Sequence, residues 1–246
     1  MEELKKKFNE LIGTLSSHDH ENLKMRLENL VSVYPFNEYE FIISTLLALR
    51  KLTLDDYHQI RDEYLDRNMF LYIFEISAPR GFGEQWAQGH LKELVPDLHR
   101  PNKKIDSDYS GQYDFVLNST NTQLVRIEVK ASRAVDFDEE APLYIKALPF
   151  DSKKRFDMNF QQVKPDCCDV FIWIAVWRDR IKYWVLSSHE VESNKYYSKG
   201  QHRGNQGEGQ LHLRWDNIAE FEKYSVPSDK LRSKIIAAYR RQNKAK

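Results

Sequence analysis

Two carboxylates and one lysine, Asp114, Glu128 and Lys130, have residue types and a spacing suited to metal-assisted chemistry. The segment 123–130 is rich in β-branched residues and alternates apolar with polar ones, which predicts a strand. Because strand side chains point to opposite faces in turn, Glu128 and Lys130 project side by side, roughly 7 Å apart along the strand. The apolar residues between them face the core, and the charged face is left for chemistry.

A hairpin would bring the first carboxylate to the second. The segment 113–118 is a shorter apolar run, and 119–122, Ser-Thr-Asn-Thr, supplies turn chemistry between the two arms. Pairing of the arms would place Asp114 alongside Glu128 and Lys130. Two carboxylates and an ammonium group would then converge.

This group of charges suits a hard divalent cation. Mg²⁺ takes oxygen ligands, and when one or two protein carboxylates hold it, water and substrate phosphate oxygens fill its other positions. A water on the metal ionises more easily, and the metal offsets charge on the attacked phosphate. Lys130 could orient that water or stabilise the charge that develops. The alternation of charge also fits a solvated strand face, so this alternative stays open on the sequence alone.

The pattern resembles that of the PD-(D/E)xK nucleases, in which an acid is followed, after a spacer, by acid-x-Lys on the next strand. Asp114, Glu128 and Lys130 match, and Tyr113 stands where the family name has proline, at a position without a direct chemical role. Within this superfamily the chain is most similar to bacterial type II restriction endonucleases. The resemblance implies Mg²⁺-dependent hydrolysis of double-stranded DNA at a short palindrome. Two-fold readout and cutting of both strands would need a homodimer.

Other acids are candidates for the same site. The resemblance implies an acid on the helix before the hairpin, and Glu84, at the start of a helical pattern over 84–94, is the best placed. A first-turn acid is equally explained by the helix dipole. Asp106 and Asp108 are rival metal ligands, but Asp114 is favoured because it adjoins the apolar run that follows it.

DNA contacts are expected from two segments. Ser132 and Arg133 follow the catalytic strand directly and would lie nearest the scissile phosphate. The glycine-rich loop 195–210 holds side chains that read base edges or meet phosphates, although a flexible surface connection is the alternative. Its expected DNA-binding residues are Lys199, His202, Arg203, Asn205 and Gln206.

The order of the elements predicts an α/β protein in two parts. Helical patterns fill residues 1–76, and residues 77–246 form the nuclease domain, a restriction-endonuclease-like mixed sheet flanked by helices. Residues 156–163 are predicted as a crossover helix, and the apolar run 169–177 as a buried central strand.

Composition adds further expectations. The 246 residues carry 37 Lys plus Arg and 37 Asp plus Glu, so a specific reader of DNA would need a local positive cleft. The charged N-terminal residues do not resemble a signal peptide, and no run of about eighteen apolar residues could span a membrane, so we expect a cytoplasmic protein without membrane contact.

Two other functions remain open at this point. A repair or recombination nuclease with the same hairpin would recognise DNA structure in place of sequence. A non-catalytic DNA-binding protein would use the same motif as a surface strand.

Overall fold

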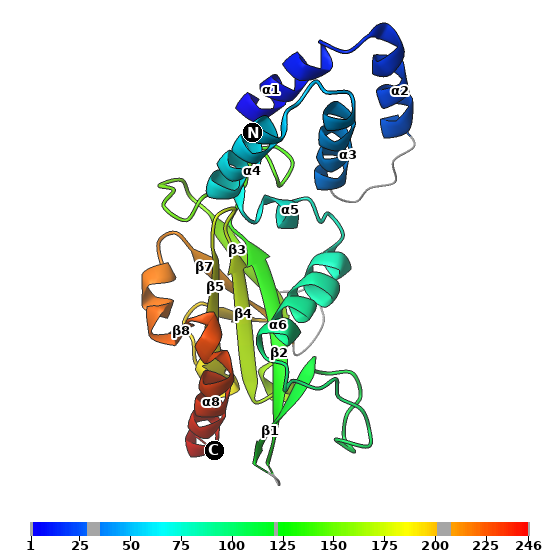
Figure 1. The fold of residues 1–246 in the computed structure, drawn as a ribbon. Helices are drawn as coiled ribbons and strands as arrows, with labels where there is room; N and C mark the ends of the chain where they lie inside the picture. The colour runs from blue at the N-terminus through cyan, green and yellow to red at the C-terminus, as the bar shows by residue number, and fades with distance from the viewer. Residues whose placement is uncertain (1, 29–34, 121–122, 201–207, 246) are drawn as a thin grey trace.

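The computed structural model describes residues 2–28, 35–120, 123–200 and 208–245. As predicted, the architecture is mixed α/β, with a five-stranded mixed sheet, a three-stranded antiparallel sheet and flanking helices. In Figure 1 the N-terminal helices lie at one end of the molecule, and the hairpin of the first two strands reaches the opposite end.

Helices form the N-terminal region, as expected. They are α1 (Glu2–Ile12), α2 (Ser17–Glu28), α3 (Pro35–Ala48) and α4 (Leu54–Asn68). Thr53 caps α4 through a reciprocal capping box with Asp56, which fixes where this helix begins. These helices have their own hydrophobic core, formed by Phe8, Leu23, Ile42, Leu46, Leu52 and Ile60. The next helix, α5 (Leu71–Phe74), instead packs its buried residues into the core of the central sheet.

The central sheet has the strand order β1-β2-β4-β5-β8. Its strands are β1 (Phe115–Thr120), β2 (Gln123–Arg133), β4 (Val170–Val176), β5 (Ile181–Ser187) and β8 (Ser225–Val226). The predicted hairpin is present as the antiparallel pair of β1 and β2, and β2 is in turn parallel to β4. All residues of β4 are buried, which confirms the predicted central strand.

The prediction of a crossover helix at 156–163 is wrong. Phe156, Met158 and Phe160 are buried at every second position, which is the period of a strand. Their partner strand comes much later in the chain, so the pairing could not be recognised locally. The second sheet consists of β3 (Asp157–Val163), β7 (Gly209–Arg214) and β6 (Tyr197–Lys199), in the order β3-β7-β6.

The remaining helical elements connect or cover the sheets. They are the π-helix η1 (Gly81–Ala87), α6 (Gln88–Leu94), α7 (Ser188–Glu192), α8 (Leu231–Ala245) and the 3-10 segments η2 (Pro165–Cys167), η3 (Ile218–Tyr224) and η4 (Ser228–Lys230). No helix of the described residues is both long and apolar enough to cross a membrane.

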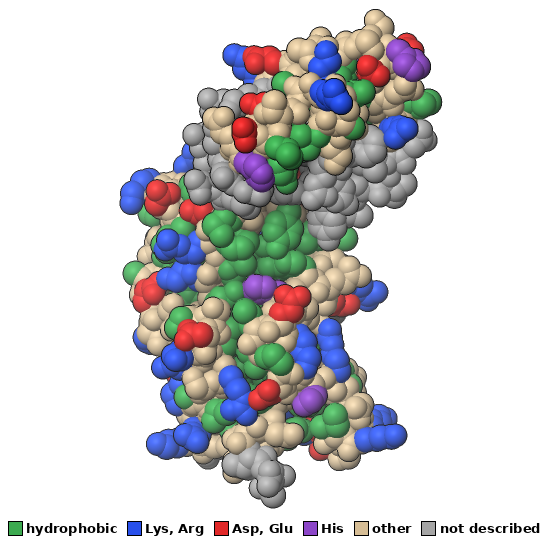
Figure 2. Space-filling model, viewed as in Figure 1, with side chains coloured by type: hydrophobic (Ala, Val, Ile, Leu, Met, Phe, Trp, Pro, Cys, Tyr) green, Lys and Arg blue, Asp and Glu red, His purple; other side chains and the backbone are tan. Residues whose placement is uncertain are grey.

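The two faces of the central sheet have separate hydrophobic cores. One face packs against α5, η1, α6 and α8, and the other packs against the second sheet. Figure 1 shows α6 and α8 on the near face, with strands of the sheet visible between them. In the space-filling view, hydrophobic side chains are exposed between the N-terminal helices and the lower part of this face (Figure 2). Lys and Arg side chains lie along both edges of the lower part.

Candidate active site

The β1–β2 hairpin brings Asp114 and Glu128 together. Phe115 pairs with Ile127 in the antiparallel register, so the preceding Asp114 falls opposite Glu128. The Asp114 backbone N–H donates to the Ile127 carbonyl at 3.0 Å. Its carboxylate reaches further along the same strand, where Oδ2 accepts the Val129 N–H at 2.8 Å. The position of the first acid is therefore fixed by backbone groups of the strand that carries the second.

Glu128 and Lys130 lie on one face of β2, as the alternation of the sequence predicts. Lys130 Nζ is 2.7 Å from Glu128 Oε1, and their side chains are only 16% and 15% exposed. Val125, Ile127 and Val129 point to the opposite face and are buried in the core under α6. The Glu128–Lys130 pair is therefore largely shielded from water. Charged side chains on a solvated strand face, the alternative left open by the sequence, would be more exposed.

Burial makes both carboxyls reluctant to ionise, and for Glu128 the negative charge of Asp114 adds to this effect. Burial raises the pKa of Glu128 to about 7, with Lys130 opposing the shift and Asp114 adding to it. Burial likewise raises the pKa of Asp114, although the Val129 N–H and Lys130 favour its charged form. Both carboxyls therefore favour the protonated form more than free carboxyls do.

Two further residues contact the site: Arg100, from the polar segment 96–110 whose basic side chains could meet phosphates, and Gln88, which no sequence pattern indicated. Gln88, the first residue of α6, donates from Nε2 to Asp114 Oδ1 at 2.6 Å, and Arg100 donates from a terminal nitrogen to Gln88 Oε1. Arg100 also lies over the Phe115 ring, with its guanidinium carbon 4.7 Å from the ring centre. A glutamine on a helix carries no distinctive pattern. Its role depends on which side of α6 packs against the hairpin, and this is known only from the tertiary structure.

Glu84, the acid expected to join the site, lies in η1, directly before α6. It forms an ion pair with Arg80 at 3.0 Å, and its side chain is 59% exposed. The residue that contacts Asp114 is Gln88, four positions later. The structure therefore supports the alternative for Glu84, a solvated acid in the first helical turn.

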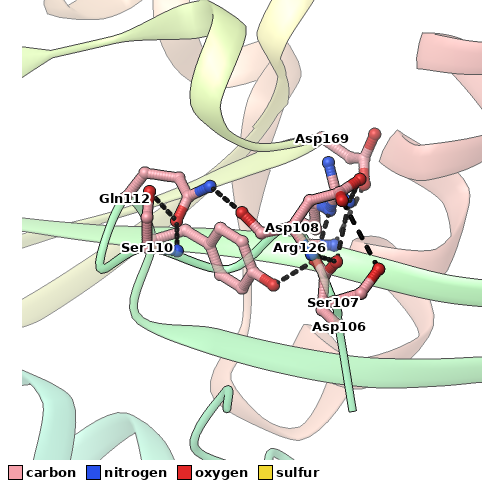
Figure 3. Close-up of polar contacts among 8 residues, drawn as sticks. Asp106, Ser107, Asp108, Ser110, Gln112, Arg126 and Asp169 are labelled. Carbon is pink, nitrogen blue, oxygen red and sulfur yellow. Dashed lines mark hydrogen bonds and ion pairs between the residues drawn. The ribbon is translucent and has the colours of Figure 1, made fainter. Parts of the chain in front are cut away.

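The rival acids Asp106 and Asp108 form ion pairs with Arg126 of β2. Arg126 is 2.7 Å from Asp106 Oδ2 and 3.9 Å from Asp108 Oδ2, as the close-up in Figure 3 shows. The Tyr113 hydroxyl donates to Asp106 as well. Burial opposes ionisation of Asp106, but the hydrogen bonds from Tyr113 and Arg126 outweigh it and lower its pKa. Asp106 is thus a structural counterion of Arg126, which leaves Asp114 as the acid beside Glu128.

The expected DNA contact by Arg133 is not supported. Its guanidinium donates to the carbonyls of Ile73 and Ile76, at 3.1 and 2.7 Å, and stacks 4.1 Å from the centre of the Phe82 ring. Burial lowers the pKa of Arg133 to about 10. The side chain therefore joins α5 and η1 to β2. The neighbouring Ser132 is half-buried and lies opposite Ala175 of β4.

Part of the expected readout loop can be placed. Lys199, at the end of β6, is 70% exposed and pairs with Glu192 at 2.8 Å. Where the loop returns, Glu208 pairs with Lys164 at 2.7 Å. The other four expected contacts lie outside the described residues, namely His202, Arg203, Asn205 and Gln206.

Within the described ranges, no group of three or more His, Cys, Asp and Glu side chains is arranged to hold a metal ion. The site therefore offers two carboxylates, Asp114 and Glu128. This number is sufficient for Mg²⁺, which keeps several waters when proteins bind it.

No protein-family model matches the sequence, and a search of the curated proteins finds no match.

Proposed function

We propose that the protein is a Mg²⁺-dependent nuclease that hydrolyses phosphodiester bonds of double-stranded DNA. The observation that carries this proposal is the hairpin itself. Two half-buried carboxylates face each other across paired strands, with an ammonium group 2.7 Å from one of them. The same three residues give the chain its resemblance to the PD-(D/E)xK nucleases.

The donor set fits magnesium. Asp114 and Glu128 supply oxygen atoms alone, and both have a raised pKa because both carboxyls are buried. A cation between them would remove that cost. Asp114 and Glu128 would hold the magnesium ion, which would supply Lewis-acid stabilisation of the charge on the attacked phosphate.

The protein's own residues have distinct roles in this proposal. Val129 and Gln88 hold the two Asp114 oxygens in place. Lys130 keeps Glu128 oriented in the resting site and, with its ammonium group beside the phosphate, orients the attacking water and stabilises the charge that develops. The apolar face of β2 fixes the spacing of these groups by packing into the core.

Site-specific restriction is the form of this activity that we propose. A homodimer would present two such hairpins to the two strands of a palindrome. The loop between β6 and β7 is the expected source of base contacts, because its polar side chains suit base edges and the strand before it ends in an exposed lysine.

Cleavage of phage-sized DNA tests the proposal. Purified protein is incubated with DNA and Mg²⁺, beside EDTA, Asp114→Asn and Lys130→Ala samples, and the products are separated on a gel. Lys153→Ala, which removes an exposed lysine outside the β1–β2 hairpin, is the matched control. We expect discrete bands from wild type and Lys153→Ala only. A smear that requires the same residues would retain the nuclease but reject site specificity, and equal inactivity of wild type and Asp114→Asn on several DNAs would reject catalysis.

A further inference from the structure

The contacts of Asp114 extend outwards to an exposed cation. Arg100 donates to Gln88, and Gln88 donates to Asp114. We propose that Arg100 binds a phosphate of the DNA backbone and, through Gln88, holds the Asp114 carboxylate in its metal-binding orientation. This inference rests on the proposed function and adds a substrate contact and two positioning residues to it.

The orientation of the Gln88 amide follows from its partners. An arginine side chain can only donate hydrogen bonds, so the Gln88 oxygen must face Arg100. The Gln88 nitrogen must then face Asp114 and donate to Oδ1. Because Gln88 is buried, only 6% exposed, its amide has little freedom to turn over. A change at Arg100 is therefore transmitted to the metal-binding carboxylate.

The Arg100 backbone is held on a rigid base. The preceding residue, His99, exchanges two backbone hydrogen bonds with Val116 of β1, both at 2.9 Å. Lys92 of α6 donates to the carbonyls of Pro96 and Leu98, which fixes the turn that leads to this position. Arg100 is thus attached to both the helix and the strand that flank Asp114.

The remaining donors of Arg100 are open to an anion. The side chain is exposed, and its hydrogen bond to Gln88 uses one terminal nitrogen of the guanidinium. Its guanidinium has five N–H donors in a planar fork, the geometry that suits a phosphate. Lys103 and Lys104 follow in the same loop and are exposed as well. The positive segment next to the acidic site matches a polyanion whose backbone passes the scissile position.

Phosphate binding at Arg100 and metal binding at Asp114 should strengthen each other. A phosphate on the outer face of the guanidinium would hold Arg100 against Gln88, which would keep Asp114 Oδ1 in place for the metal. DNA and Mg²⁺ would then each bind more tightly in the presence of the other. Second-layer partners of metal ligands typically change metal affinity about 10- to 100-fold when they are removed.

Four variants distinguish the phosphate contact of Arg100 from the relay, that is, the hydrogen bonds from Arg100 through Gln88 to Asp114. Gln88→Leu removes the link, Arg100→Met removes charge and link, Arg100→Lys keeps the charge without the planar fork, and Lys103→Met is the matched control in the same loop. DNA binding is measured in Ca²⁺ by fluorescence anisotropy over a range of salt, and Mn²⁺ binding by calorimetry with and without DNA. The Mg²⁺ concentration for half-maximal cleavage is measured in parallel, and thermal melts verify folding.

We expect Gln88→Leu to weaken Mn²⁺ binding about 10- to 100-fold with little change in DNA affinity. Arg100→Met should weaken both and lower the salt slope of DNA binding by about one. Arg100→Lys should recover DNA affinity but not Mn²⁺ affinity, and Lys103→Met should change DNA affinity alone. Wild-type Mn²⁺ affinity in both Gln88→Leu and Arg100→Met would overturn the relay. If wild type cleaves in that case, only the relay fails, whereas a wild type that neither binds Mn²⁺ nor cleaves DNA rejects the proposed function as well.

Discussion

Because the pKa of Glu128 is raised in the folded protein, we expect the stability of the metal-free protein to depend on pH. The pKa of Glu128 rises from 4.5 to about 7 in the folded protein, chiefly because the carboxyl is buried. A group whose pKa is raised by folding stabilises the folded state while it is protonated. This stabilisation is complete below about pH 4.5 and is lost as the pH rises through 7.

The magnitude follows from the shift. A change of one pH unit in a pKa corresponds to about 1.4 kcal/mol, so Glu128 contributes about 3 kcal/mol to the loss of stability between pH 4.5 and 7. The side chain is 15% exposed, so solvent screening reduces this value little. For a chain of this size, that is roughly 6 to 12 °C in melting temperature.

Glu128→Gln isolates the effect, since an amide does not titrate and can still donate to Asp114. Other groups also titrate in this range, among them His90, whose pKa is lowered by burial and whose effect has the opposite sign. The test is therefore the difference between wild type and Glu128→Gln, measured by urea unfolding in EDTA at several pH values. Glu140→Gln, at an exposed acid, is the matched control. Wild type should lose stability relative to Glu128→Gln as the pH rises from 4.5 to 7, and parallel curves would refute the raised pKa of Glu128.

Three further results are expected. Mg²⁺ should raise the melting temperature of wild type more at pH 8 than at pH 5.5, because at pH 5.5 binding must first remove the proton of Glu128. An equal rise in Asp114→Asn would contradict this. Asp106→Asn should cost about 1 to 3 kcal/mol of unfolding free energy, measured in urea, by weakening the hydrogen bonds from Tyr113 and Arg126, yet keep Mg²⁺-dependent cleavage. If the Asp106→Asn protein is folded but does not cleave DNA, this result would instead support Asp106 as a metal ligand. Phe160→Ala should cost about 3 to 5 kcal/mol in the same assay, since its ring is buried and stacked on Trp173, whereas Gln161→Ala, exposed at the next strand position, should be nearly neutral.

The hairpin and the central strand could be predicted because their patterns are local. Alternation over 123–130 places Glu128 and Lys130 on one face whatever the strand pairs with, and an unbroken apolar run such as β4 is stable only when both faces are covered. The cap at Thr53 is equally local, because its hydrogen bonds connect residues three apart.

Other features depend on partners distant in the sequence. Residues 156–163 form a strand because they pair with β7, where Met158 lies opposite Leu213 and Phe160 opposite Leu211. Arg133 points into the protein because it donates to the carbonyls of Ile73 and Ile76. No spacing in the sequence encodes either contact.

The candidate site itself divides along the same line. The sequence alone determined which acid and lysine share a strand face, since this follows from a period of two. The sequence favoured Asp114 as the acid beside them, but only the tertiary structure showed what holds each acid: Arg126 engages Asp106, while Val129 and Gln88 fix Asp114. The physical reason is that a carboxylate is committed by whichever donors the fold brings within hydrogen-bonding distance, and those donors come from a different helix and strand.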